Sequence, residues 1–207
     1  MIGNVKSRKP KIDFWTLDEF QKVISLLYKG DYYEHYLFIS FWLLFMTGMR
    51  IGEAAALQWS DIDFETGILS INKNLYYKTM TEYKFVEPKT QAGIRDIVID
   101  DDTIKELKEW KEVQQKVLTN CDFVMSYSGI PTSKHTLPRA LEKLAELAGV
   151  HRIKIQTTLG TYGHLYPNSN FEVAKKLTGK LTYTPATKSV ADYTSNQFTA
   201  EYHKQVN

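Results

Sequence analysis

The chain has 207 residues, of which 43% are hydrophobic, and this is enough to bury the core of one large domain or of one domain with appendages. Its formal net charge of +2 does not by itself indicate a nucleic-acid-binding protein, although local basic clusters remain compatible with one. The single cysteine, Cys121, excludes an intramolecular disulfide and a metal site built from cysteines alone, which fits a reducing cytoplasm.

Helices are predicted for the first quarter of the chain. A capping box at Thr16–Glu19 starts an amphipathic helix, and Gly30 is expected to end it. An apolar run at residues 36–46 is too short to span a membrane and therefore predicts a buried helix, from about residue 34 to residue 46. Gly48 then turns the chain, and a short helix is expected to carry residues 50–57.

Alternating apolar and polar residues predict three short strands after these helices. Polar turns join the strands, which favours an antiparallel arrangement. The strands are expected at residues 67–71, 83–86 and 94–99. Together they indicate a small three-stranded antiparallel sheet inserted among helices.

Two further helices give an α+β fold that is mostly helical. Asp101 or Asp102 is expected to cap a charged helix over residues 103–118. An amphipathic helix over residues 137–148 is expected to end at Gly149.

The two ends of the chain have the composition of extensions to a central domain at residues 14–181. Residues 1–13 are polar and basic without the apolar segment of a secretory signal, which predicts a linker that is either a solvated tail or a contact with a DNA backbone. Near the other end, residues 171–177 are compatible with a short helix, whereas residues 182–207 are polar, lack periodicity and predict an extended tail.

Arg50 is the first candidate for a chemical role. It follows a Thr-Gly turn and opens a helix, so its planar guanidinium and the first amides of the helix are able to converge on one phosphate. The simpler alternative is an ion pair between Arg50 and Glu53 on the surface of the helix.

Lys89 and Tyr162 are the other two candidates. Lys89 lies in a turn between two predicted strands, where a lysine can reach a groove and protonate a leaving oxygen, although most such lysines only keep a sheet edge soluble. A phenol has a pKa of about 10, so Tyr162 needs a base or cationic surroundings before it can attack a phosphodiester. Four other tyrosines are better interpreted as packing residues with a polar end: Tyr28, Tyr32, Tyr33 and Tyr36.

Three segments, taken in order, resemble motifs of the tyrosine recombinase (phage integrase) family. Residues 47–63, which begin Thr-Gly-Met-Arg-Ile-Gly-Glu, resemble its first arginine motif. Pro88–Thr90 with Arg95 resembles its β-hairpin lysine motif, and Gln156–His164 resembles its nucleophile motif. From residue 14 to about residue 177 the chain follows the order of the catalytic domain, most like integrases of phages and conjugative transposons.

The resemblance implies a site-specific DNA recombinase or integrase that cuts and rejoins strands through a 3′-phosphotyrosyl intermediate. Tyr162 would be the nucleophile, Arg50 would stabilise the pentacoordinate phosphorane, and Lys89 would be the general acid for the 5′-hydroxyl leaving group. The resemblance implies neither a metal nor another cofactor. Because the tyrosyl ester would keep the energy of the broken bond, strands could be rejoined without ATP.

The resemblance also implies the partners. Double-stranded DNA is the expected partner, bound by a homotetramer in the cytoplasm, with no membrane and no small-molecule substrate. Each subunit is expected to exchange the region after Leu177 with a neighbour, and the separate N-terminal DNA-binding domain of the family is expected to be absent.

The chain departs from the family between the lysine and the tyrosine. The family has a His-x-x-Arg motif and a later His or Trp there, on two helices, whereas this chain has His151 and Arg152 side by side and no such helices before Gln156. The apparent gap between residues 155 and 156 amounts to about 30 residues. It is either a genuine deletion or a mobile block that the sequence omits, and we favour the second because excision of two core helices should prevent folding.

Two alternatives to an active recombinase follow. A genuine deletion favours a catalytically inactive DNA-binding remnant or regulator derived from an integrase. A helical protein-interaction domain, in which Arg50, Lys89 and Tyr162 are unrelated surface residues, is the less favoured alternative because three motifs occur in the expected order.

Overall fold

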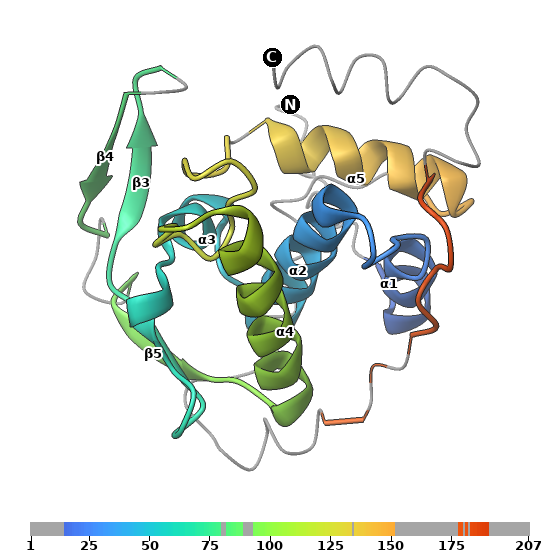
Figure 1. Cartoon of the computed structure of the whole chain (residues 1–207), viewed down its shortest axis with the longest axis horizontal. Coiled ribbons are helices and arrows are strands. Elements are labelled where there is room, and N and C mark those ends of the chain that lie inside the picture. The colour runs from blue at the N-terminus through green and yellow to red at the C-terminus, as the bar shows by residue number, and fades with distance from the viewer. Residues whose placement is uncertain are drawn as a thin grey trace, which may run out of the picture.

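The structure is a computed structural model, and it describes residues 15–79, 82–88, 93–133, 135–151, 178–179, 181 and 183–190. One buried helix, α2 (Tyr32–Thr47), lies at its centre, and other helices surround it (Figure 1). Asp31 caps α2 by accepting the amides of Tyr33 and Glu34. The sequence of α2 is apolar on every face, which explains why helices can pack around it on several sides.

Helix α1 (Leu17–Ile24) packs against α2 and begins with the predicted capping box of Thr16 and Glu19. Its predicted end at Gly30 is wrong, because Ser25 caps the helix. After Ser25 the chain makes tight turns that bury Leu27, so apolar spacing continues beyond the helix and misled the prediction.

Two helices that are longer than α1 pack against α2. Helix α4 (Asp101–Val117) is capped by Asp100 rather than by Asp101 or Asp102, since the Asp100 carboxylate accepts the amide of Thr103. The buried indole N–H of Trp42 in α2 donates to the Thr103 hydroxyl at 2.9 Å, which joins the two helices. Helix α5 (Thr136–Leu147) contacts both α1 and α2.

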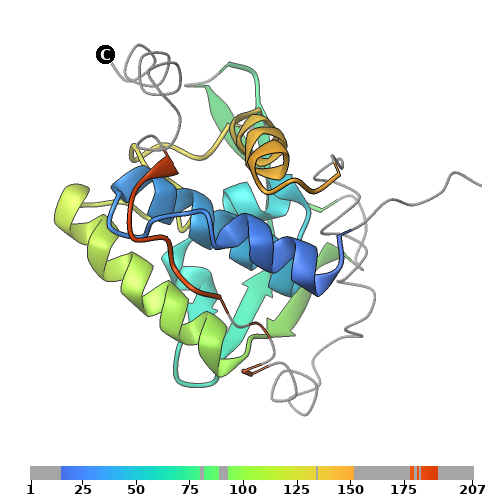
Figure 2. The same ribbon diagram turned by 90° about the vertical axis from the view of Figure 1, so that its right-hand side faces the viewer.

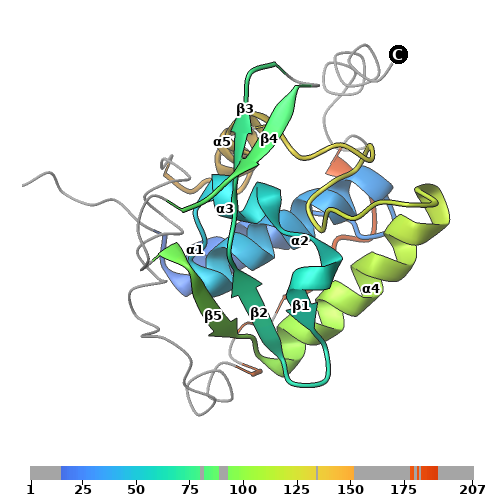
Figure 3. The ribbon, with the colours of Figure 1, turned by 90° about the vertical axis from the view of Figure 1, so that its left-hand side faces the viewer.

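A three-stranded antiparallel sheet confirms the predicted fold class, but its membership differs from the prediction. Its order is β1 (Ile62–Asp63), β2 (Ile68–Ile71) and β5 (Arg95–Val98). The predicted strand at 83–86 exists as β4 (Tyr83–Val86), yet it pairs only with β3 (Asn74–Tyr77) in a separate hairpin. Figure 3 shows this hairpin rising beside the sheet.

Packing explains why β3 and β4 leave the sheet. Leu75 is buried against Ala55 and Ala56 of α3 (Ile51–Ala56), so the hairpin follows that short helix rather than β2. The place beside β2 is taken by β1, in which Ile62 pairs with Leu69.

The final described residues, 181 and 183–190, form a strap that lies along α2 and α4 (Figure 2). The ring of Tyr183 is 4.8 Å from that of Phe38, and its hydroxyl donates to Glu106 at 3.0 Å. Glu34 accepts the amide of Val190 at 2.7 Å. This part of the predicted tail therefore packs on its own chain.

The predicted linker at 1–13 and the predicted helix at 171–177 lie outside the described residues. The same holds for both sides of the apparent gap between 155 and 156. The domain boundaries at these positions therefore stay predictions. No helix in the described part of the chain is both long enough and apolar enough to cross a bilayer.

Candidate active site

A tight turn between α2 and α3 positions Arg50. Gly48 ends α2 in the left-handed conformation, with φ 63°, which a residue with a side chain adopts only at a cost. The Thr47 hydroxyl donates to the carbonyl of Leu43 at 2.6 Å, and Met49 is buried. The turn is thus fixed on both sides of Gly48, and it delivers Arg50 to the surface as the N-cap residue of α3.

The side chain of Arg50 is 76% exposed, while that of its partner Glu53 is only 3% exposed. The Arg50 guanidinium donates to Oε1 of Glu53 at 2.8 Å, and the Arg50 amide donates to Oε2 at 3.0 Å. The surface pair anticipated as the simpler alternative therefore exists, but its carboxylate is buried. One edge of the guanidinium is held, and most of the group faces solvent, where an anion can approach it.

A second arginine reaches the same carboxylate from the sheet. Arg95, the first residue of β5, donates to Oε2 of Glu53 at 2.9 Å, and its side chain is 23% exposed. Its guanidinium also donates to the carbonyl of Gly93 at 3.4 Å. Glu53 therefore joins the start of α3 to the start of β5, which are 42 residues apart at this contact.

The two arginines keep Glu53 ionised. Burial is the largest effect and would raise the pKa of the Glu53 carboxyl, but hydrogen bonds from Arg95 and Arg50 outweigh it and hold that pKa below its ordinary value. The cluster thus carries two cationic groups and one buried anion, so it has an excess positive charge next to the exposed edge of Arg50.

Lys89 and Tyr162 lie outside the described residues, so their positions relative to Arg50 stay predictions. The segment that contains Lys89 nevertheless begins and ends at described residues. Pro88 follows β4, and Gly93 comes shortly before Arg95. Gly93 lies so close to Pro88 that a Cβ added at Gly93 would collide with the side chain of Pro88. The two ends of this segment therefore meet near Arg95.

Three of the tyrosines interpreted as packing residues do pack: Tyr36 lies within the core, and the partly buried Tyr32 and Tyr33 pack against it. The hydroxyl of Tyr36 shares a hydrogen bond of 2.7 Å with the Thr132 hydroxyl in a buried setting. Burial raises the pKa of Tyr32 to about 12 and raises that of Tyr33 as well. A raised pKa disfavours the phenolate, so none of these three is a suitable nucleophile.

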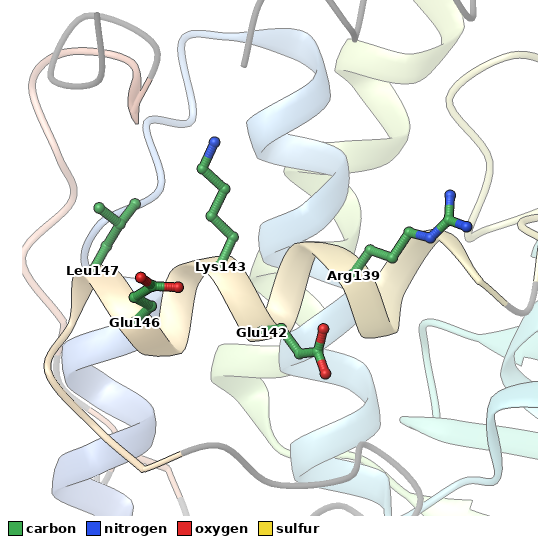
Figure 4. A pocket seen from close by; sticks show the side chains of 5 residues that line it. All are labelled: Arg139, Glu142, Lys143, Glu146 and Leu147. Atoms are coloured by element: carbon green, nitrogen blue, oxygen red, sulfur yellow. The ribbon is translucent and has the colours of Figure 1, made fainter. Parts of the chain in front are cut away.

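A hollow of about 330 Å³ lies along α5 (Figure 4). Its described lining consists of Arg139, Glu142, Lys143, Glu146 and Leu147. Because the charges are mixed, this hollow favours neither anions nor cations. Within the described ranges, no group of three or more His, Cys, Asp or Glu side chains is arranged to hold a metal ion.

The sequence did not reveal that Glu53 is buried or that Arg95 bonds to it. The Arg-x-x-Glu spacing indicates a pair within one turn of helix, but such pairs are commonly exposed. The only sequence signal for Arg95 was its place in the resemblance to the lysine motif.

Comparisons with known proteins identify the family and the fold. The model of the phage integrase family matches residues 14–160. The ICEBs1 integrase of Bacillus subtilis (strain 168) is 28% identical over an alignment of 209 positions, which covers 82% of this chain and 55% of that protein. A XerC-like tyrosine recombinase of Caldanaerobacter subterraneus is 34% identical over 114 residues, which cover 51% of this chain and 28% of that protein. The chain spans about half the length, or less, of these curated relatives.

Solved structures share the fold. The Tn1549 transposon integrase in complex with transposon right end DNA has a TM-score of 0.58 and 19% identity, covering 99% of this chain and 69% of that one. XerA recombinase has a TM-score of 0.54 and 16% identity, covering 93% of this chain and 64% of that one. At these identities the likeness is one of fold.

Proposed function

Because this chain belongs to the phage integrase family of tyrosine recombinases, we propose that it cuts and rejoins double-stranded DNA at specific sites through a 3′-phosphotyrosyl intermediate. The observation that supports this proposal most is the anchored and exposed guanidinium of Arg50. Glu53 fixes one edge of that group, while 76% of the side chain remains open to a phosphate. A preorganised cation that faces the reacting group is the usual way to stabilise a transferring phosphoryl.

The proposed reaction needs three groups. The phenol of Tyr162 gives up its proton to solvent as its oxygen attacks the phosphorus, and the bond from phosphorus to the 5′ oxygen breaks as the new bond forms. Lys89 gives a proton to that 5′ oxygen, and Arg50 stabilises the charge on the equatorial oxygens. Attack by a 5′-hydroxyl on the tyrosyl ester then releases Tyr162 and rejoins the strand without ATP.

The partner and the assembly are part of the proposal. The Tn1549 integrase structure contains transposon DNA, which supports duplex DNA as the partner here. We propose a homotetramer on two duplexes. Exchange of the strap between subunits would require the contact between Val190 and Glu34 to open and to re-form on a neighbour.

A nicked-duplex selection tests the proposal without knowledge of the target sequence. Duplexes with a randomised segment and a nick beside it trap a covalent adduct, because the short 5′-hydroxyl fragment diffuses away. We expect wild-type protein to capture a subset of sequences and Tyr162→Phe to capture none. Salt-sensitive DNA binding without any adduct would instead identify an inactive DNA-binding remnant, and no binding at low salt would overturn the DNA proposal altogether.

A further inference from the structure

Within the described ranges Glu53 receives three hydrogen bonds, and they come from two separate parts of the fold. Oε1 is bound by the Arg50 guanidinium at 2.8 Å. Oε2 is bound by the Arg50 amide at 3.0 Å and by the Arg95 guanidinium at 2.9 Å. Arg50 is on the α2–α3 turn and is largely exposed, whereas Arg95 is on the sheet and is largely covered. Arg95 is therefore the partner that is itself held in place.

Both the backbone and the side chain of Arg95 are held in place. It is the first residue of β5 and lies opposite Ile71 of β2, whose side chain is buried. Its second bond, to the carbonyl of Gly93, ties it to the closing end of the segment that contains Lys89. One guanidinium thus contacts both the support of Arg50 and the end of the Lys89 segment.

We propose that Arg95 is a positioning residue for the recombination reaction: it fixes Glu53, which orients Arg50, and it ties Gly93 to the same carboxylate cluster. The inference rests on the proposed function. It assigns to Arg95 no contact with the phosphate, and its effect on the reaction is transmitted through Glu53 and through Gly93.

The physical reason is the cost of a buried carboxylate. Without Arg95, Oε2 of Glu53 keeps a single described donor, the Arg50 amide, and the exposed Arg50 side chain must hold the pair alone. Because the Arg50 side chain is 76% exposed, water and other rotamers compete with its bond to Glu53, so Arg50 would spend less time in the orientation that meets a phosphate. A misplacement of about 1 Å can slow a reaction about 100-fold.

The charged groups around Glu53 predict a specific change in its pKa when Arg95 is removed. In the part of the chain that the structure describes, the charged groups bonded to Glu53 are Arg50 at the start of α3 and Arg95 on β5. The adjoining strand β3 presents uncharged Asn74 next to Gly52. Because Arg95 lowers the pKa of Glu53 and burial raises it, removal of Arg95 moves that pKa upward.

The test compares Arg95→Gln with Arg95→Lys in the full chain, and Ser70→Ala serves as a matched control. Ser70 donates to Asp96, the residue after Arg95, so its loss disturbs the same strand pair without touching Glu53. We would measure adduct formation on a nicked duplex recovered from the selection, DNA affinity by fluorescence anisotropy, and Glu53 ionisation by the carboxyl ¹³C shift in an NMR pH titration.

For Arg95→Gln we expect adduct formation to slow by about 10- to 100-fold, DNA affinity to change by less than about threefold, and the acid limb of the rate profile to move to higher pH. Lysine keeps the charge but loses the planar fork, so Arg95→Lys should restore part of the rate. Ser70→Ala should resemble wild type. A merely structural role would weaken affinity and stability together and would leave the acid limb in place.

The titration separates the two proposals. An unchanged Glu53 titration in Arg95→Gln, or an unchanged adduct rate, would overturn the positioning role. A wild-type chain that forms no adduct would overturn the recombinase proposal, while the Glu53 titration would still decide whether Arg95 controls this carboxylate. If Arg95→Gln does not fold, Arg95→Lys is compared with wild type instead. A wild-type acid limb together with a wild-type rate of adduct formation would then overturn the positioning role.

Discussion

The hydroxyl of Tyr77 on β3 donates to the carbonyl of Thr132 at 2.5 Å, and this bond ties the β3–β4 hairpin to the loop before α5. The two residues are 55 positions apart. Thr132 is itself buried, and its hydroxyl bonds to Tyr36 of α2. The hairpin that leads into the Lys89 segment is therefore attached to the helical core through Thr132.

We expect Tyr77→Phe to lower the free energy of unfolding by about 1–2 kcal/mol, because the Thr132 carbonyl loses its partner in a buried setting. Urea unfolding measures the change. The matched control is Tyr76→Phe on the same strand, since Tyr76 is 54% exposed and its loss should cost less than about 0.5 kcal/mol. Equal effects of the two substitutions would show that the Tyr77 bond does not stabilise the fold.

Gly48→Ala should both destabilise the chain and disturb the site. The left-handed φ of 63° strains a residue with a side chain, at a cost on the order of 1–2 kcal/mol, and Arg50 lies only two residues further on. The proposed adduct formation should slow more than the loss of stability explains.

Gly129→Ala provides the comparison for Gly48→Ala. Gly129 also has a positive φ, of 85°, and an added Cβ there would meet nothing within 4 Å, so the strain is similar and the site is elsewhere. Thermal unfolding should report similar losses for both variants, and adduct formation should separate them. If Gly48→Ala and Gly129→Ala lost adduct formation equally, the effect of Gly48→Ala would be due to lost stability alone.

Elements with local signals could be predicted from the sequence. The capping box of Thr16 and Glu19, the apolar run that forms α2, and Gly48 all act within a few residues, so each is visible in a short window. Strand β3 was missed because its four residues alternate only weakly, and its partner on α3 is two alanines, which no pattern in β3 reveals.

Contacts between distant segments could not be predicted. The bond from Arg95 to Glu53 spans 42 residues, and the burial of Glu53 depends on how the sheet and α3 come together. Arg50 was found from its turn and its motif, which are local. The contacts of Glu53 that hold Arg50 depend on the fold, so the sequence did not reveal them.

Replacement of Arg50 separates charge from geometry in the proposed reaction. Arg50→Ala should slow adduct formation by at least about 10³-fold, because the transition state loses its cation. Arg50→Lys should fall between alanine and wild type, since an ammonium keeps the charge but cannot hold Glu53 and a phosphate with one planar fork. Quenched time courses on the selected nicked duplex measure both rates.

Arg50→Ala should also lower the free energy of unfolding by about 1–3 kcal/mol, because Oε1 of the buried Glu53 carboxylate loses its described donor, and denaturant unfolding measures this loss so that it can be compared with the loss of rate. Lys78→Met is the control for loss of one positive charge, as Lys78 is exposed and pairs only with nearby Glu82 among the described contacts. If Lys78→Met slowed adduct formation as much as Arg50→Ala, the effect would be general electrostatic attraction rather than a role of Arg50.

His35 on α2 should make the fold sensitive to acid. The side chain is 1% exposed, and neither ring nitrogen has a hydrogen-bond partner in the described structure. Burial, with a smaller effect from Lys29, lowers the pKa of His35 to about 4 from its ordinary 6.5. Between these two values the unfolded chain binds a proton that the folded chain does not, so this contribution to stability is complete above pH 6.5 and is lost as the pH falls toward 4.

His35→Leu isolates this contribution, because leucine removes the proton-binding group and leaves an apolar side chain against Trp110 and Phe38. The raised pKa values of Glu34 and Asp100, due mainly to burial, act in the opposite direction and are present in both proteins. Urea unfolding at several pH values should show wild type losing up to about 3 kcal/mol more than His35→Leu between pH 6.5 and 4. His135→Leu, at an exposed position, should retain the wild-type pH dependence. Parallel stability curves for wild type and His35→Leu would mean that His35 is protonated in the folded chain, and water or a rearranged neighbour would then have to solvate its charge.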